Sequence, residues 1–358
     1  MSSVSSRAIL VPESFNASIE QLFTSLREKC GVYEVRRFSI AYVFSVFVCT
    51  SYLIGCAAPS NSTQDPRIVR AFSSPVQGNA GSWTVVAPLP TGLSALAAAT
   101  SPSHKVYAVG GYTGVLRSSN LLEAFSPSTD AWVAKAPMPT ARLGLAAAFI
   151  GDQLFTVGGV NNGYVNTVEA YNPSTNTWAK RAPITPRRCC AAVGVSNGIL
   201  YAIGGENLSG LLNSVEAYNP VTNSWSAKSP MPTPRSYLGV GVVGGVIYAV
   251  GGYGRHGAYL NVVEAYDPST DTWTTKSPMP SPRGALAVAV VAGVLYAVGG
   301  SDAGGPVNTL EAYDPSTDTW SSDPPMPTAR LALAAAAADG KLYAIGGSLS
   351  DEVDAYTP

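Results

Sequence analysis

The sequence predicts an all-β protein, a six-bladed β-propeller in which four-stranded sheets stand around a central channel. The prediction rests on three markers that recur at nearly constant spacing, as expected for a propeller built from repeats of about 40–50 residues. Diglycines begin at Gly110, Gly158, Gly204, Gly251, Gly299 and Gly346. Tryptophans recur at Trp83, Trp132, Trp178, Trp225, Trp273 and Trp320. An acidic–Ala–aromatic triplet begins at Glu123, Glu169, Glu216, Glu264, Glu311 and Asp354.

One repeat shows why this unit should be a sheet. The apolar run 238–243 is rich in small residues, as a crowded strand beside the channel requires, and 246–250 forms the second strand. Gly251-Gly252 ends that strand because glycine tolerates positive φ and close backbone approach. A third strand over 262–266 leads through the Pro- and Asp-containing turn 267–271 to an outer strand that Trp273 opens. Such a sheet needs neighbours on both faces, which a ring provides.

The two ends of the repeat region predict how the ring closes. The first tryptophan, Trp83, precedes any complete unit, and the last unit ends at Tyr356 without a tryptophan. Pairing of a strand at about 82–86 with one at about 353–356 would complete the sixth blade from both termini and leave no open edge. Removal of residues 80–90 should therefore destabilise the whole ring.

These markers resemble the kelch repeat, in which a diglycine is followed by an aromatic residue and then by a tryptophan. In five repeats the aromatic residue precedes its tryptophan by seven positions, as from Tyr266 to Trp273. The resemblance covers residues 81–358. It implies a kelch propeller, a fold that serves both binding proteins and enzymes, so fold alone does not assign function.

The N-terminal region predicts membrane targeting. Residues 38–58 carry no charge and follow Arg36 and Arg37, and such a run can cross a bilayer or begin a secretory signal. The sequence Leu53-Ile54-Gly55-Cys56 resembles the bacterial lipobox, which implies cleavage before Cys56 and its lipidation. Residues 57–80, rich in Ser, Pro, Asn and Gln, would then be a flexible tether.

Residues 1–37 leave two interpretations of this leader open. A signal peptide normally begins near its first methionine, so an extension of this length suggests a mis-assigned start. Alternatively, the segment 38–56 is an uncleaved anchor behind a short cytoplasmic helix. Both interpretations place the propeller outside the cytoplasm, since Arg36 and Arg37 favour a cytoplasmic N-terminal flank.

Arginines form the first candidate binding surface. An arginine stands ten residues after the tryptophan in five repeats, whereas the first repeat has Leu93. If these side chains ring one channel mouth, they favour an anionic ligand. The alternative is that they pair with the repeated glutamates and have an architectural role. The five residues are Arg142, Arg188, Arg235, Arg283 and Arg330.

The loops after the diglycines are the second candidate, because function often lies where repeats differ. In the loop 253–261, Arg255 and His256 lie between Tyr253 and Tyr259, a combination able to stack on a sugar or hold a peptide. Tyr237, two residues after Arg235, is a further mouth candidate.

Composition excludes several functions. The net charge is −1 and no Lys/Arg run is present, which argues against nucleic-acid binding. Two histidines exclude a histidine metal cluster, and no metal or other cofactor is expected. The adjacent Cys189 and Cys190 are no disulfide framework, although a strained vicinal disulfide stays open beside two small apolar residues.

The sequence therefore favours an exported, membrane-tethered, monomeric kelch propeller that binds a protein or a glycan. The alternative is a carbohydrate-active enzyme similar to the sialic acid mutarotases of bacterial envelopes. That resemblance implies chemistry by carboxylate and arginine side chains, for which Glu206 beside the positions of Arg188 and Arg235 is the candidate acid/base. Enzymatic activity thus stays uncertain, with binding preferred and no other catalytic residue assigned.

Overall fold

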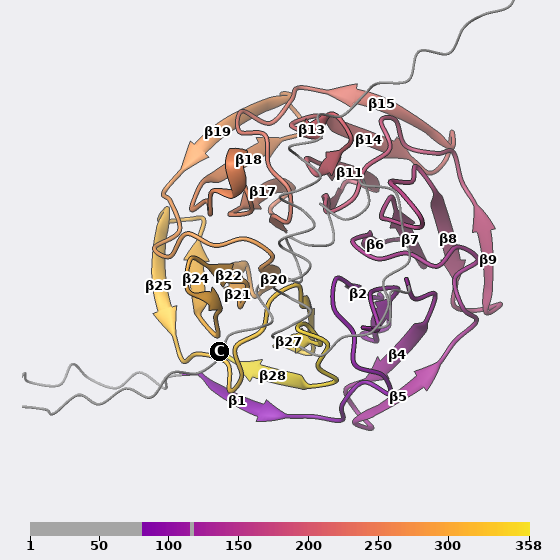
Figure 1. Ribbon diagram of the computed structural model, residues 1–358, viewed down its shortest axis with the longest axis horizontal. Coiled ribbons are helices and arrows are strands. Elements are labelled where there is room, and N and C mark those ends of the chain that lie inside the picture. Colours follow the sequence, from indigo (N-terminus) through magenta and orange to yellow (C-terminus); the bar gives the residue numbers. More distant parts are fainter. Residues whose placement is uncertain (1–80, 115–117) are drawn as a thin grey trace, which may run out of the picture. The chain divides into compact units, whose positions relative to one another are not determined.

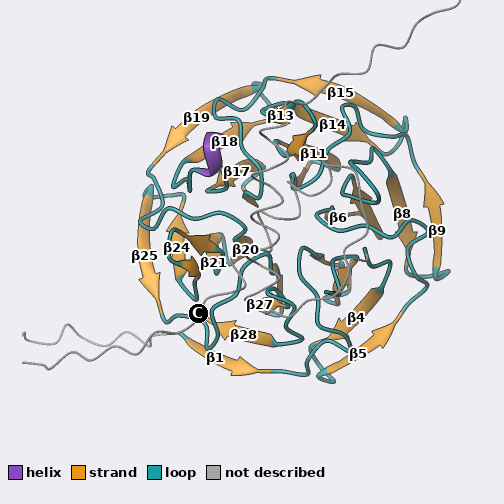
Figure 2. Ribbon diagram, viewed as in Figure 1, coloured by secondary structure: helices purple, strands orange, loops and turns teal. Residues whose placement is uncertain are grey.

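A computed structural model describes residues 81–114 and 118–358, so the predictions of a leader, a lipidated Cys56 and a tether lie outside the described residues. The described chain forms six four-stranded antiparallel sheets around a central axis (Figure 1), which confirms the six-bladed β-propeller. Within it, the short 3-10 helix η1 (Arg255–Gly257) is the one helical segment (Figure 2). No helix of this described part is long and apolar enough to span a membrane.

Each blade runs from an inner strand at the channel to an outer strand at the rim. Blade 1 has β2 (Ala97–Thr100), β3 (Val106–Val109), β4 (Leu122–Ser126) and β5 (Ala131–Ala134). Blade 2 has β6 (Ala146–Ile150), β7 (Gln153–Val157), β8 (Val168–Asn172) and β9 (Thr177–Lys180). Blade 3 has β10 (Ala192–Ser196), β11 (Ile199–Ile203), β14 (Val215–Asn219) and β15 (Ser224–Lys228).

The other three blades repeat this order, and two loops add short ribbons. Blade 4 has β16 (Gly239–Val243), β17 (Val246–Val250), β18 (Val263–Asp267) and β19 (Thr272–Lys276). Blade 5 has β20 (Ala287–Val291), β21 (Val294–Val298), β24 (Leu310–Asp314) and β25 (Thr319–Asp323). Blade 6 has β26 (Ala334–Ala338), β27 (Lys341–Ile345), β28 (Val353–Thr357) and β1 (Ser82–Val85). The ribbons are β12 (Glu206–Asn207) with β13 (Gly210–Leu211) and β22 (Ser301–Asp302) with β23 (Gly305–Pro306).

The inner strands are rich in alanine, glycine and valine because neighbouring blades approach most closely at the channel. A Cβ at Gly239 would lie 2.3 Å from Val288 Cγ2, and one at Gly241 would lie 2.7 Å from Leu295 Cδ2. Blade 4 could not dock on blade 5 with larger side chains at these two points. Further from the channel, where the blades are more widely separated, larger Leu, Val, Ile, Tyr and Met side chains are buried between them.

The two chain ends close the ring as predicted. Strand β1 pairs antiparallel with β28, with Trp83 opposite Tyr356 and Val85 opposite Asp354. The Trp83 indole N–H donates to the Pro324 carbonyl at 2.8 Å, which joins blade 6 to blade 5. The other five tryptophans make the equivalent bond to the preceding blade, so the sixth link uses residues from opposite ends of the propeller.

A circle of backbone hydrogen bonds surrounds one end of the channel. Each blade contributes the residue two positions before its inner strand, and its N–H donates to the carbonyl of the equivalent residue in the preceding blade at 2.8–3.0 Å. All six residues have positive φ, between 50° and 59°. We call this circle the hydrogen-bond ring; its members are Ala95, Gly144, Cys190, Tyr237, Ala285 and Ala332.

Candidate functional site

The five repeated arginines lie inside the blades, and this differs from the expected ring of exposed guanidinium groups. Each is 0–1% exposed. Each faces an acidic residue of its own blade, the alternative that the sequence left open. The pairs are Arg142–Glu169, Arg188–Glu216, Arg235–Glu264, Arg283–Glu311 and Arg330–Asp354.

In five blades a buried arginine holds together the segments at the mouth end of the blade. Arg142 donates to the Gly158 carbonyl at 2.7 Å and to the Glu169 carboxylate at 2.8 Å. Burial lowers the pKa of Arg142 to about 10, and the charge of Glu169 opposes that shift. The guanidinium therefore stays cationic at neutral pH and remains paired. Because the guanidinium N–H groups donate to partners inside the blade, they are not exposed to an anionic ligand.

The surface at this mouth comes from three positions in each blade. The first and second positions directly follow the arginine position. The third position follows the diglycine, and its residue pairs with the residue at the first position through a β-bridge or a backbone hydrogen bond. Blades 1, 2, 5 and 6 carry mostly small or apolar side chains there. Blades 3 and 4 instead carry Cys189, Cys190 and Glu206, and Ser236, Tyr237 and Tyr253. The polar and aromatic groups of the mouth are thus concentrated on two adjacent blades.

Glu206 is the centre of the polar part. Its carboxylate accepts a hydrogen bond from the Ser236 hydroxyl at 3.1 Å and one from the Tyr164 hydroxyl at 3.4 Å. The Cys189 thiol lies 3.9 Å from the same carboxylate. Three consecutive blades therefore converge on one carboxylate, with Tyr164 from blade 2, Cys189 from blade 3 and Ser236 from blade 4.

Three tyrosines form the aromatic part, and we call them the tyrosine stack: Tyr237, Tyr253 and Tyr259. The ring centroids of Tyr237 and Tyr253 are 5.6 Å apart, and those of Tyr253 and Tyr259 are 5.4 Å apart, both edge to face. The Tyr253 ring lies over Gly284 of blade 5, where a Cβ would approach it to 2.7 Å. All three rings are half-buried. Tyr237 also has a left-handed backbone, with φ of 52°, which is unusual for a bulky residue.

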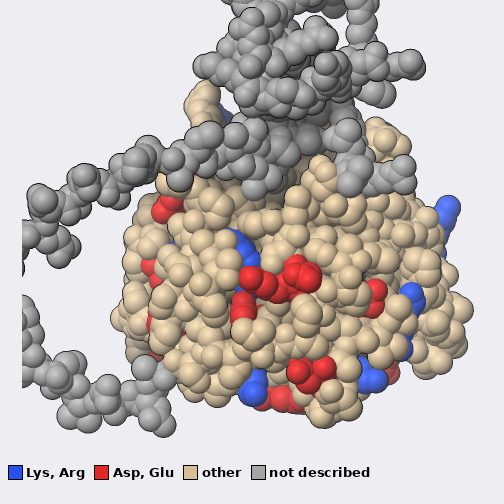
Figure 3. Space-filling model, turned by 60° about the horizontal axis from the view of Figure 1, so that its bottom comes forward, with Lys and Arg blue, Asp and Glu red and all other residues tan. Residues whose placement is uncertain are grey.

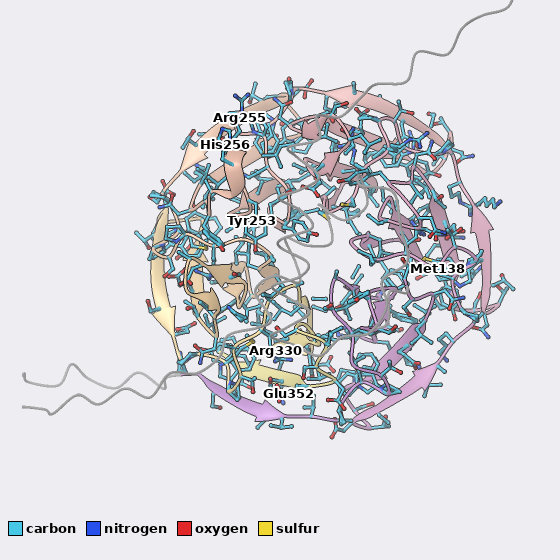
Figure 4. The ribbon with its side chains drawn as sticks, viewed as in Figure 1. Met138, Tyr253, Arg255, His256, Arg330 and Glu352 are labelled. Carbon is cyan, nitrogen blue, oxygen red and sulfur yellow. The ribbon has the colours of Figure 1, made fainter. Side chains whose placement is uncertain are left out.

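Arg255 and His256 are separate from this stack. Both are exposed and belong to η1, where His256 has φ of 57°. Figure 4 shows them further from the channel than Tyr253. The structure therefore brings together the predicted Tyr237 and Tyr253 and leaves the predicted Arg255 and His256 on the outer part of the loop.

Cys189 and Cys190 are buried, and both carry thiols rather than a shared disulfide bond. Burial is the main cause that raises the pKa of the Cys190 thiol, and the neighbouring Cys189 and Glu206 raise it further. Tyr237 hydrogen bonds to the Cys190 side chain. Together with Glu206, the two thiols form a group of potential metal ligands within the part of the chain that the structure describes.

A pocket of about 390 Å³ lies at the opposite ends of the strands, between blades 5 and 6. It is lined by the recurring aromatic residues Tyr296 and Tyr356 and by Asp323, which stands where blades 1–4 carry a lysine or arginine. Figure 3 shows that the side of the propeller turned forward in that view is largely uncharged, with small groups of acidic and basic side chains. Neither feature distinguishes one blade chemically as clearly as the Glu206 cluster and the tyrosine stack do.

Sequence reasoning did not assign Tyr164, Ser236 and the two cysteines to the site. A signal for them was present, because Cys189 and Cys190 replace the small or apolar pairs found in other repeats. Their convergence with Tyr164, however, depends on how blade 2 packs beside blade 3. A repeat alignment of the sequence alone does not contain that relationship.

The fold and this mouth define a repeat-built β-propeller whose side-chain chemistry is concentrated on two blades. A family model described as the KLHDC2/KLHL20/DRC7 Kelch-repeats domain matches residues 75–252, and the Kelch motif model matches residues 234–280 and 282–327. The chain belongs to the kelch-repeat family.

Individual relatives match over short stretches. Kelch-like ECH-associated protein 1B of Danio rerio is 47% identical over 58 residues, which are 16% of this chain and 10% of that protein. Kelch-like protein 35 of Homo sapiens is 40% identical over 63 residues, 18% of this chain and 11% of that protein. The chain thus matches about a tenth of the length of these relatives.

A solved structure titled "Structure of YjhT" has a similar fold. Its TM-score is 0.65 and its sequence identity is 18%, with 76% of this chain and 95% of that chain covered. At this identity the likeness supports the propeller fold alone.

Proposed function

We propose that this kelch propeller is a binding module that receives a protein partner at the mouth of blades 3 and 4. The tyrosine stack is the observation that carries the proposal. Tyrosine combines a large apolar face with a polar tip and is enriched among the residues that dominate binding energy. Here three such rings are held edge to face on one side of the mouth, and each keeps part of its surface accessible.

The support for a protein partner also comes from what the mouth lacks. The repeated arginines are buried in ion pairs, so the earlier reason to expect an anionic ligand does not apply to this surface. Aromatic rings beside hydroxyl groups suit an extended peptide segment, whose backbone supplies donors and acceptors and whose side chains cover the rings.

Site-specific crosslinking followed by affinity measurement tests this function. A photo-crosslinking amino acid at position 259 of the full-length protein would identify the bound segment in cells. The corresponding synthetic peptide would then be titrated against the wild type, Tyr253→Ala and Tyr112→Ala. Tyr112 is the matched control, since it occupies the equivalent position after the diglycine of blade 1.

We expect Tyr253→Ala to weaken peptide binding by at least about tenfold, which is a typical effect of truncating a dominant interface residue. Tyr112→Ala should bind as the wild type does. Equal binding by all three proteins would refute the proposed location. Specific retention of a glycan in place of a peptide would refute the proposed class of partner.

We also propose that the propeller is exported and tethered to a membrane. The apolar segment 38–58 and the sequence ending at Cys56 support this. Intact-mass analysis of the membrane fraction should find a chain that begins at a lipidated Cys56, or a full-length chain if the segment is an uncleaved anchor. A full-length chain found free in the cytoplasm would contradict both forms of the proposal.

An enzyme acting on a carbohydrate is the second candidate, and the Glu206 cluster is the observation that favours it. A carboxylate beside the hydroxyls of Ser236 and Tyr164 could exchange a proton with a sugar hydroxyl while neighbouring groups orient the ring. Ring-opening of free sugars, followed by nuclear magnetic resonance, tests it. Glu206→Gln should abolish any such activity if the candidate is correct, and activity that persists in this variant would exclude the proposed acid/base.

A further inference from the structure

We propose that Cys189, Cys190 and Glu206 form a binding site for Zn²⁺ at the mouth of the propeller. Each residue offers one ligand atom, and these three atoms lie within 4.8 Å of one another. Two sulfurs and one carboxylate oxygen are a ligand set that zinc accepts. The site would exist whether or not the tyrosine stack also binds a partner.

The spacing is close to what a tetrahedral ion requires. With the usual Zn–S and Zn–O bond lengths, ligand atoms on a zinc ion are separated by roughly 3.6–3.8 Å. The Cys189 sulfur already lies 3.9 Å from the Glu206 carboxylate. Movement of the other ligand atoms by less than about 1 Å, through small side-chain rotations, would bring all three within bonding distance of one ion.

The backbone holds the two halves of this site together. Cys189 and Glu206 exchange two N–H···O=C hydrogen bonds, both at 3.0 Å, although they are 17 positions apart in the chain. Cys190 belongs to the hydrogen-bond ring, and its positive φ of 58° lets two successive side chains contribute to one cluster. In an extended strand, successive side chains would point to opposite faces.

Neighbouring side chains orient the ligands as outer groups do in established zinc sites. Ser236 and Tyr164 donate to the Glu206 carboxylate, and Tyr237 hydrogen bonds to Cys190. None of the three neighbours is a positively charged residue that would compete with the ion. Each ligand thus has at least one contact that restricts its position before the ion arrives.

The ligand chemistry selects a thiophilic ion over calcium or magnesium. Thiolates bind Zn²⁺ strongly, whereas Ca²⁺ and Mg²⁺ require oxygen ligands. On binding, each thiol releases its proton to solvent and the two thiolates and the carboxylate enter the coordination sphere. Three protein ligands leave one tetrahedral position, which water fills.

Comparison among the blades argues against a purely structural role for Cys189 and Cys190. The equivalent pairs in the other blades are Ser94-Ala95, Leu143-Gly144, Ser236-Tyr237, Gly284-Ala285 and Leu331-Ala332. The architecture therefore accepts serine, leucine, alanine, glycine or tyrosine at these positions and does not require sulfur. Blade 3 also has the carboxylate of Glu206 where the others carry tyrosine, valine or serine.

Cadmium provides a direct spectroscopic test, because Cd²⁺ bonded to thiolate absorbs in the ultraviolet. The full-length protein would carry serine at positions 30, 49 and 56 in every sample, so that the thiols of Cys189 and Cys190 alone can bind. We expect one equivalent of Cd²⁺ to produce the absorption and Zn²⁺ to displace it. Cys189→Ser/Cys190→Ser, with circular dichroism like that of the parent, should lose the absorption. Its retention, or no stoichiometric binding by the parent, would overturn the proposal.

A second measurement covers the case in which the double variant does not fold. An ion that binds the folded protein raises its thermal midpoint, and the rise grows with ion concentration. Zn²⁺ should stabilise the parent but stabilise Glu206→Gln only at a concentration at least about tenfold higher, because an amide replaces a charged ligand. Asp302→Asn, in the corresponding loop of blade 5 and outside both the cluster and the buried arginine pairs, is the control. An equal response of the parent and Glu206→Gln, or no response of the parent, would overturn the proposal.

Discussion

Leu93 and Glu123 occupy the two positions of blade 1 that hold an arginine and its acidic partner in the other five blades. Leu93 is buried, and Glu123 is 7% exposed. One carboxylate oxygen of Glu123 is buried without a hydrogen-bond partner. Blade 1 therefore has the acidic residue of the pair found in the other five blades but lacks the arginine.

The first prediction concerns pH. Burial raises the pKa of Glu123 above its ordinary value of 4.5. The stability associated with its neutral form is therefore fully present below that value and is lost as the pH rises through the raised pKa. Glu123→Gln removes this loss, so it should be more stable than the wild type at neutral pH and nearly equal to it in acid. Thermal midpoints measured at several pH values check this. A constant difference between the two proteins across the range would refute it.

Restoring the missing cation gives a second prediction. Leu93→Arg should reduce the loss of stability between acidic and neutral pH, because a guanidinium at this position would stabilise the ionised Glu123. The same substitution combined with Glu123→Gln should lack this benefit, since a buried arginine then has no acidic partner. Chemical denaturation of both variants distinguishes these cases; if the two behave alike, the added guanidinium does not reach the carboxylate.

Removal of one member of a complete arginine–acid ion pair should lower the stability of the protein. Arg283 and Glu311 are both almost fully buried and in direct contact. Glu311→Gln leaves an uncompensated buried guanidinium and should lower the free energy of unfolding by about 3–5 kcal/mol. Arg283→Met/Glu311→Gln should cost less than the sum of the two single changes, because neither charge is then isolated. A double-mutant cycle by denaturant unfolding measures this coupling, and strict additivity would show that the pair does not interact.

Closure of the ring predicts a large effect of a small deletion. Deletion of 81–90 removes β1 and the bond from Trp83 to Pro324, which exposes the edge of β28 and separates blade 6 from blade 5. We expect a lower thermal midpoint together with greater aggregation, measured by calorimetry and light scattering. Deletion of residues 65–74, which lie before the first strand, is the control and should leave the midpoint unchanged.

Gly284→Ala tests the support of the tyrosine stack. A Cβ at residue 284 would clash with the Tyr253 ring, so the ring must move away from its contact with Tyr259. We expect weaker binding of the crosslinked peptide with little change in global stability, as measured by titration and thermal unfolding. Gly304→Ala, in an exposed loop of the same blade, should bind normally. Unchanged affinity of Gly284→Ala would show that the position of Tyr253 does not matter for binding.

The propeller and its closure were predictable because they depend on positions along a repeat. The strand prediction over 246–250 matches β17, and the orphan Trp83 identified the pairing with Tyr356. The direction of the arginine side chains was not predictable in the same way. A constant spacing places Arg142 in the connection that leads into an inner strand, but whether its guanidinium faces the channel or Glu169 depends on packing within the blade.

The candidate site was predictable only in part, for a related reason. Tyr237 and Tyr253 are on consecutive segments of one repeat, so the sequence places them at the same mouth. Glu206 and Tyr164 come from different blades, and their hydrogen bond depends on the lateral packing of those blades. The two cysteines looked like small core residues because their cluster forms only when Glu206 is brought beside them.

The hydrogen-bond ring has a consequence for how this mouth can diversify. Its bonds join peptide groups only, and each runs from one blade to the preceding blade. Because the sixth bond returns to the first residue, the six blades are linked in a closed hoop of backbone hydrogen bonds. Its six positions carry alanine, glycine, cysteine and tyrosine without interrupting the hoop. The frame of the mouth is thus insensitive to which side chain projects from it, and new chemistry can arise on one blade while the other five keep the same shape.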